Sequence, residues 1–130
     1  FTFSVHGAHN FPFRKAASDL DVPLPDGTDD GGYLAALERC LPQAWERARP
    51  EIVFYLAGSD PHERDRLGRM RLTHAGLQQR DARVIGLCLT EKVPLVLTLA
   101  GGYAEPIEHS VRAHLNTYRA LNDALGRLNA

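Results

Sequence analysis

The chain has 130 residues and a mass of 14.4 kDa, which fits one domain or part of one. Its formal net charge of −1 provides no long-range field that would favour nucleic acid or an acidic membrane, and it has no apolar run of about 18 residues that could span a bilayer. Cys40 and Cys88 fall on apolar helical positions, so they are expected to be reduced core residues of a cytoplasmic protein. The chain starts with a strand candidate at Phe1 and no initiator Met, which suggests that an upstream segment has been removed.

Strands and helices are predicted to alternate along the chain. In order, we expect a strand, an edge strand, a helix, a strand, a helix, a strand and a last helix, at residues 1–5, 21–25, 30–47, 51–58, 73–90, 93–102 and from 106 onward. Strands that are apolar on both faces and alternate with helices are typical of a parallel sheet covered on both sides. We therefore predict an α/β fold of three layers, a mostly parallel sheet flanked by helices, in a single segment over residues 1–130.

Local signals predict where these elements begin and what they bury. Asp29 or Asp30 is expected to cap the first helix and Thr73 the second. Pro42 should kink the first helix, and Pro23 restricts residues 21–25 to a sheet edge. The last helix has an apolar stripe that is expected to face the core, formed by Ile107, Val111, Leu115, Tyr118, Leu121 and Leu125.

Two of the predicted strands end alike. "YLAGSD" delivers Asp60 and "TLAGGY" delivers Tyr103, each after small residues. Ligands of open parallel sheets gather at the carboxyl ends of the strands, and small residues let backbone and ligand approach closely. The pattern favours a site that contains Asp60 and Tyr103, although ordinary turns and helix caps can have the same composition.

Histidines and arginines near these strand ends have plainer interpretations. Asp60 and His62 could meet one ion, but His62 opens a charged loop and is expected to be a solvated surface residue. His6 and His9, in the first long loop, are expected at the surface or behind a pocket. The four arginines of residues 64–71 fit a solvated loop, with an anion-facing rim as the alternative. The sequence has no nucleophile elbow, P-loop or dinucleotide-binding glycine fingerprint.

The segment "YLAGSDPHERDRLG" (55–68), followed by "LAGGY" (99–103), resembles the carboxyl-terminal half of histone deacetylases and their bacterial relatives. "DRLG" and the "FPFRK" of the first loop are most similar to the class IV type. The resemblance covers nearly the whole chain and implies the arginase/deacetylase fold.

The resemblance also implies a reaction, the hydrolysis of an N-acyl amide by a zinc-activated water. The matching aspartate of the family is a zinc ligand, here Asp60, and zinc would act as a Lewis acid that lowers the pKa of the water. The matching tyrosine, here Tyr103, would polarise the acyl carbonyl and stabilise the oxyanion. Asp65 matches a second family aspartate with a structural role.

Further residues of the pocket follow from the same resemblance. Gly101 and Gly102 would shape the pocket wall, and Phe11 would line the acyl-lysine tunnel. Ser4 and Val5 would bind a monovalent cation such as K⁺.

The chain also departs from the family pattern. The other two zinc ligands, an Asp-x-His pair, and the tandem histidines for general acid/base work lie upstream of this segment in the family. We therefore expect the segment alone neither to hold zinc tightly nor to hydrolyse an amide. We expect it to pair with the missing amino-terminal half of the same protein, or with another copy of itself through an exposed apolar sheet edge.

The implied substrate is an acylated lysine or an acylated amine, with no direct nucleic-acid or membrane partner. Two alternatives stay open. One is a non-catalytic α/β module that binds a small molecule or a partner at the same strand ends. The other is an interaction fragment, which a Tyr103 side chain buried in a packed core would favour.

Overall fold

The computed structural model describes residues 1–128, in which the helices and strands follow the predicted order. The strands are β1 (Phe3–Gly7), β2 (Leu20–Leu24), β3 (Val53–Ala57) and β4 (Leu95–Leu99). The helices are α1 (Asp30–Ala48), α2 (His74–Thr90) and α3 (Glu108–Leu128).

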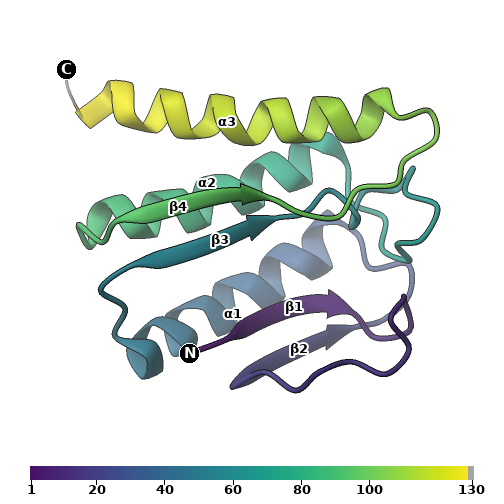
Figure 1. The fold of residues 1–130 in the computed structure, drawn as a ribbon, viewed down its shortest axis with the longest axis horizontal. Coiled ribbons are helices and arrows are strands. Elements are labelled where there is room, and N and C mark those ends of the chain that lie inside the picture. The colour runs from purple at the N-terminus through teal and green to yellow at the C-terminus, as the bar shows by residue number, and fades with distance from the viewer. Residues whose placement is uncertain (129–130) are drawn as a thin grey trace.

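The strands form two parallel pairs rather than one sheet. β1 pairs with β2 from Phe3–Leu20 to Gly7–Leu24, and β3 pairs with β4 from Val53–Leu95 to Ala57–Leu99. All four strands point in the same direction, and β1 and β3 lie on the inner sides of the two pairs (Figure 1). The β2 strand pairs with β1 alone, so Pro23 lies in an edge strand as its sequence requires.

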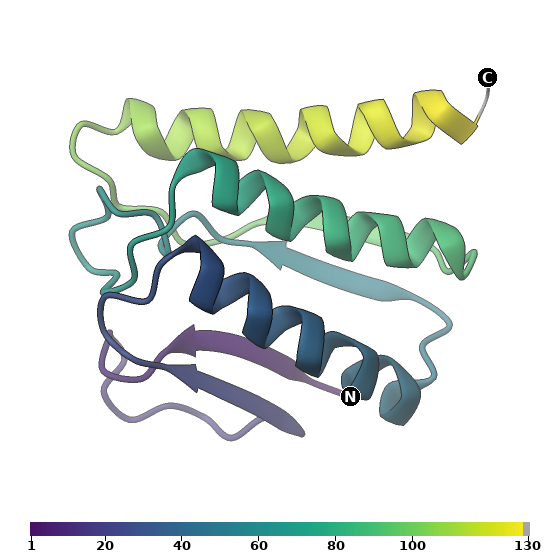
Figure 2. The same ribbon diagram turned by 180° about the vertical axis from the view of Figure 1, so that it is seen from behind.

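Helices α1 and α2 cover one face of both pairs, and α3 runs beside α2 (Figure 2). The core lies between these helices and the strands. It consists of Val22, Leu24, Tyr33, Leu34, Ala36, Leu37, Cys40, Met70, Leu72, Leu77 and Ala113. The described residues therefore supply the sheet layer and one helical layer of the predicted three.

The predicted helix caps are confirmed. The Asp29 side chain accepts the backbone N–H of Gly32 at 2.9 Å, and the Thr73 hydroxyl accepts that of Gly76 at 3.1 Å. Each bond satisfies one of the free N–H groups of a first helical turn. Pro42 lies inside α1.

The apolar stripe of α3 lies on the surface of residues 1–128, so the prediction that it faces the core is wrong. Ile107, Val111, Leu115, Tyr118 and Leu125 are exposed, at 43% to 55%. The helix packs on α2 with its small residues Ala113 and Thr117, which are buried, while the buried Ser110 hydroxyl accepts the backbone N–H of Ala104. Small side chains allow a close helix approach, and the large apolar ones are left on another face.

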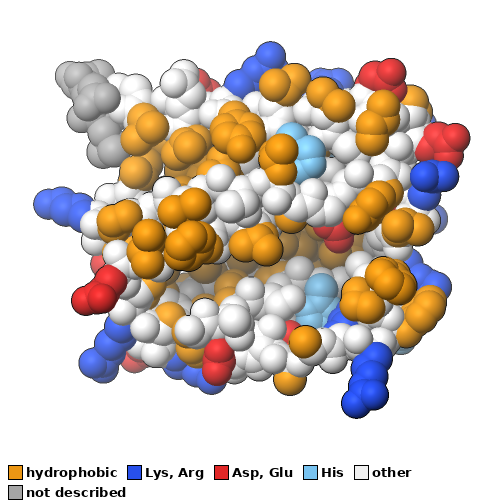
Figure 3. Space-filling model, in the orientation of Figure 1, with side chains coloured by type: hydrophobic (Ala, Val, Ile, Leu, Met, Phe, Trp, Pro, Cys, Tyr) orange, Lys and Arg blue, Asp and Glu red, His pale blue; other side chains and the backbone are white. Residues whose placement is uncertain are grey.

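The exposed stripe continues onto the sheet. Phe54 and Leu56 on β3 are 64% and 66% exposed, and Val96, the register partner of Phe54 on β4, is 36% exposed. Apolar side chains gather over α3, β3 and β4 in Figure 3, above a hollow that runs across the molecule. We call Phe54, Leu56, Val96, Val111 and Leu115 the apolar face.

Two simpler expectations have clear outcomes. Cys40 and Cys88 are both free and buried, as predicted. Among the described residues, no helix combines the length and the apolar character needed to cross a membrane.

Candidate active site

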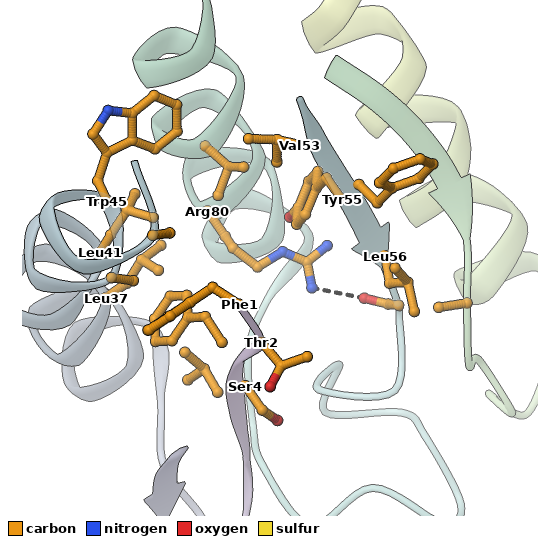
Figure 4. Close-up of a pocket in the computed structure, with 18 of the residues that line it drawn as sticks. Phe1, Thr2, Ser4, Leu37, Leu41, Trp45, Val53, Tyr55, Leu56 and Arg80 are labelled. Atoms are coloured by element: carbon orange, nitrogen blue, oxygen red, sulfur yellow. Dashed lines mark hydrogen bonds between the residues drawn. The ribbon is translucent and has the colours of Figure 1, made fainter. Parts of the chain in front are cut away.

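A groove of about 770 Å³ separates the two strand pairs. Ser4 of β1 and Leu56 of β3 stand on opposite sides of it, and Leu37, Leu41 and Trp45 of α1 close one end (Figure 4). Gly58, Asp60 and Ala100 line it where β3 and β4 end. The groove is therefore mostly apolar, with a carboxylate at the carboxyl end of a strand.

Asp60 is the acidic residue of this groove. It is partly buried, and burial raises the pKa of its carboxyl above the ordinary value. The loop after β4 lies against it, since a Cβ built on Gly101 would be 3.1 Å from Asp60 Oδ1. Within residues 1–128, Asp60 forms no salt bridge. Its environment thus resists a negative charge that no paired cation neutralises.

A buried arginine holds the start of the Asp60 loop. Arg80 Nη1 donates a hydrogen bond of 2.6 Å to the carbonyl oxygen of Gly58, shown as the dashed line in Figure 4. The guanidinium is paired in turn with Asp81, at 2.8 Å from Nη2 to Oδ1. The Tyr55 and Thr117 hydroxyls donate to the two Asp81 oxygens at 2.5 Å and 2.6 Å. This network joins β3, α2 and α3 to the backbone two residues before Asp60.

Sequence reasoning missed the Arg80–Asp81 pair. Asp81 lies four residues after Leu77 and four before Ile85 on the inward face of α2, and it is fully buried. One signal could have revealed this pair: an aspartate at an inward helical position directly after an arginine. A buried charge needs a partner of opposite charge, and the arginine supplies it.

The Tyr103 segment is held by Asp65. Asp65 Oδ2 accepts the backbone N–H of Tyr103 at 2.6 Å, and Oδ1 accepts those of Leu67 and Gly68 at 2.8 Å and 2.7 Å. The same carboxylate therefore shapes the loop after β3 and fixes the loop after β4. This contact fits the structural role implied for Asp65.

The Tyr103 side chain is 49% exposed and lines a second, more open depression of about 510 Å³ with Arg66 and Pro106. It does not line the groove that contains Asp60. The two residues thus emerge from paired strands at the same end of the sheet but occupy different surface depressions.

The remaining predicted pocket residues are spread around the same end. Ser4 and Val5 line the groove, and Ser4 Oγ lies 2.9 Å from His6 Nδ1. Phe11 is 70% exposed, and its ring meets that of Phe13 edge-on at 6.3 Å. Gly102 packs closely, because an added Cβ would overlap Ser59 Oγ.

The prediction that His62 is a solvated surface residue is wrong. It is 2% exposed, and His74 and His109, at the starts of α2 and α3, pack against its ring. Its Nδ1 accepts the backbone N–H of Arg64 at 3.1 Å. His9 is exposed as expected, with 70% of its side chain accessible. The nearby arginines fit a solvated loop, in which Arg69 pairs with Asp26 at 3.1 Å.

Comparison with known proteins places this geometry in a family. The family model described as "Histone deacetylase domain" matches residues 1–118. The chain is 43% identical over 123 residues to an uncharacterized protein of Picosynechococcus. The matched region makes up 95% of this chain and 41% of that protein. Over 106 residues, it is 30% identical to histone deacetylase 2 of Arabidopsis thaliana, covering 79% of this chain and 27% of that one.

Solved structures share the fold. An acetylpolyamine aminohydrolase from Burkholderia pseudomallei matches 92% of the chain with a TM-score of 0.71 and 20% identity. The histone deacetylase Clr3 matches 78% with a TM-score of 0.64 and 24% identity. The chain spans 37% and 17% of these two proteins. The fold is thus of the arginase/deacetylase type, and the chain is less than half as long as the relatives it matches.

Proposed function

Because this chain belongs to the histone deacetylase family, we propose that it is the carboxyl-terminal part of a zinc-dependent hydrolase that cleaves N-acyl amides of lysine or of a free amine. The observation that carries the proposal is the partly buried carboxylate of Asp60, which follows β3 and forms no salt bridge within residues 1–128. A deacylase-type hydrolase is what the family supports; the zinc, the substrate class and the roles of individual residues are our proposals.

Asp60 fits a zinc ligand. A carboxylate oxygen is an ordinary zinc donor, and a cation at the groove would neutralise a charge that burial disfavours. Bound zinc would supply Lewis-acid chemistry, polarising an acyl carbonyl and lowering the pKa of a water. A catalytic zinc site takes about three protein ligands, so other residues of the parent protein must complete this one. The 130 residues alone are accordingly expected to bind zinc weakly and to be inactive.

Tyr103 is proposed to donate its phenolic hydrogen to the oxyanion that develops during hydrolysis. Its exposure leaves the hydroxyl free for such a role and disfavours the alternative of an interaction fragment with a buried Tyr103. Exposed side chains change rotamer within nanoseconds, so the ring can turn from its own depression toward the groove when substrate binds. The Asp65 contact would keep the backbone of Tyr103 fixed during that turn.

The remaining pocket roles are proposals of the same kind. Gly101 and Gly102 would form the wall beside the acyl group, and Phe11 has an exposed ring that can line a tunnel. Ser4 and Val5 would hold a monovalent cation such as K⁺, for which Ser4 Oγ would have to exchange its contact with His6.

The groove also indicates how the site is completed. β1 and β3 run in the same direction and face each other across the groove without pairing, and parallel sheets are normally continuous and buried on both faces. We propose that a strand from the amino-terminal half of the same protein pairs with both edges, while further elements of that half cover the apolar face. Self-association of the isolated chain would use the same edges.

The test uses the full-length protein that contains this chain. Hydrolysis of an acetyl-lysine peptide, a longer acyl-lysine peptide and an acetylated polyamine is measured with and without a zinc chelator. Chelator-sensitive turnover of at least one substrate, abolished by Asp60→Asn, supports the proposal. The non-catalytic module predicts no turnover of any of them, and chelator-resistant turnover would remove zinc from the proposal.

A further inference from the structure

Three histidines from distant parts of the chain meet beside the Asp60 loop. His62 lies in that loop, His74 is the first residue of α2, and His109 is the second residue of α3. The ring centroid of His62 is 4.2 Å from that of His74 and 5.3 Å from that of His109, and the last two are 5.5 Å apart. We call these three residues the histidine cluster.

The spacing of the ring nitrogens is close to that of metal ligands. One nitrogen of each ring lies within 4.8 Å of the others. His74 Nε2 and His109 Nδ1 are 3.3 Å apart. Two imidazoles on one tetrahedral zinc, at about 2.0–2.1 Å each, have nitrogens about 3.3–3.4 Å apart. Ring nitrogens up to 4.8 Å apart would have to approach by up to about 1.5 Å to reach that spacing.

The His74 ring is in a form that can bind a metal. The pKa of His74 is lowered to about 4, chiefly by burial and also by His62, Arg112 and His109, while Glu63 opposes them. A neutral imidazole has a free lone pair, which is the ligand form. His74 Nδ1 is buried and has no hydrogen-bond partner among residues 1–128, so hydrogen bonds within this part of the chain do not fully satisfy the ring.

We propose that the histidine cluster binds a divalent transition-metal ion of the kind that prefers imidazole, such as Zn²⁺ or Co²⁺. The ion would tie the Asp60 loop to the starts of α2 and α3 and so stabilise that loop. None of the three histidines lines the groove that contains Asp60, so this site is separate from the proposed catalytic one. An ion at His62 Nδ1 would compete with the Arg64 N–H for that nitrogen. The inference does not depend on the hydrolase proposal.

The experiment titrates Co²⁺ into the metal-free full-length protein, with bound ion counted from the visible absorption and thermal unfolding followed in parallel. All variants carry Asp60→Asn, so that binding at the groove does not contribute. His74→Gln and His109→Gln each remove one proposed ligand at a partly exposed position. His9→Gln, at an exposed histidine outside the cluster, is the matched control.

We expect the Asp60→Asn protein and its His9→Gln derivative to bind one Co²⁺ at the cluster and to unfold at a higher temperature with it. His74→Gln and His109→Gln should each weaken this binding more than about tenfold, because even indirect partners of metal ligands contribute about 10–100-fold. If one variant fails to fold, the other decides. Equal Co²⁺ binding and equal thermal shifts in all four proteins, or no binding to the Asp60→Asn protein, would overturn the inference.

Discussion

The guanidinium of Arg80 donates a hydrogen bond of 2.6 Å to the carbonyl oxygen of Gly58, two residues before Asp60. The arginine is 5% exposed and is neutralised by Asp81, which is itself fully buried. A rigid, charged donor of this kind fixes the backbone from which the proposed zinc ligand projects. Arg80 affects Asp60 mainly by fixing the backbone that carries it. The positive charge of the guanidinium also favours the ionised form of the Asp60 carboxyl.

Arg80→Lys is therefore expected to reduce turnover by the full-length protein by about 10–100-fold, the usual effect of losing a partner that orients a metal ligand. The lysine keeps the charge but cannot contact both Gly58 and Asp81 as the planar guanidinium does. Arg80→Met should destabilise the fold by about 3–5 kcal/mol, because it leaves Asp81 buried without a cation. Denaturant unfolding and steady-state kinetics measure the two effects.

Arg83→Met on the same helix is the control. Arg83 pairs with the exposed Glu38, and exposed pairs contribute about 0–1 kcal/mol. Equal losses of stability for the methionine variants at positions 80 and 83 would show that the buried network is unimportant.

Asp65→Asn tests the link between the two strand-end loops. The asparagine amide keeps one acceptor oxygen, but an NH₂ group replaces the other. Either the hydrogen bond from the Tyr103 N–H or those from the Leu67 and Gly68 N–H groups are therefore lost. We expect kcat to fall by about 10–100-fold while zinc affinity changes little. Glu63→Gln, an exposed acid in the same loop, should have no such effect. A weakened zinc affinity with unchanged kcat would contradict this role for Asp65.

Gly68→Ala and Gly86→Ala should have opposite effects on stability. A Cβ at Gly68 would overlap the carbonyl oxygen of Asp60, so the loop must shift and destabilisation of about 1–3 kcal/mol is expected. A Cβ at Gly86, inside α2, meets nothing within 4 Å, and alanine there should stabilise by about 0.5–1 kcal/mol. Thermal unfolding distinguishes the two; stabilisation by Gly68→Ala would show that the loop has more room than the structure gives it.

The apolar face predicts how the isolated chain behaves. Residues 1–130 alone are expected to associate, and replacing Phe54 and Leu56 together by Gln should reduce the associated fraction, because both side chains are more than 60% exposed. Phe13→Gln is the control, since Phe13 is 79% exposed but lies in the first loop. Sedimentation velocity at several concentrations gives the answer, and a monomeric parent chain at all of them would contradict the expectation.

Much of the fold could be predicted because its signals are local. The Asp29 and Thr73 caps, the edge strand with Pro23 and the strand that precedes Asp60 each follow from neighbouring residues. The separation of β1 from β3 could not be predicted in the same way, because strand pairing is a long-range property that no local pattern contains.

The failures have the same origin. The α3 stripe has helical periodicity, but periodicity does not say which face meets a neighbour, and close packing of Ala113 and Thr117 on α2 decides that. His62 follows a polar loop pattern, yet the starts of two helices cover it. Asp60 and Tyr103 could be placed at the strand ends, whereas the direction of the Tyr103 side chain depends on surroundings that the sequence does not reveal.

The most direct test of the central claim compares turnover of an acylated-lysine or acetylated-polyamine substrate by the zinc-loaded full-length protein and three variants. Asp60→Asn should abolish turnover, and Tyr103→Phe should lower kcat by about 10²–10³-fold, the usual effect of removing one oxyanion donor. Asp123→Asn, at an exposed acid on α3, should leave turnover unchanged. Turnover by Asp60→Asn and Tyr103→Phe equal to that of the parent protein would contradict a shared catalytic role for the two strand ends.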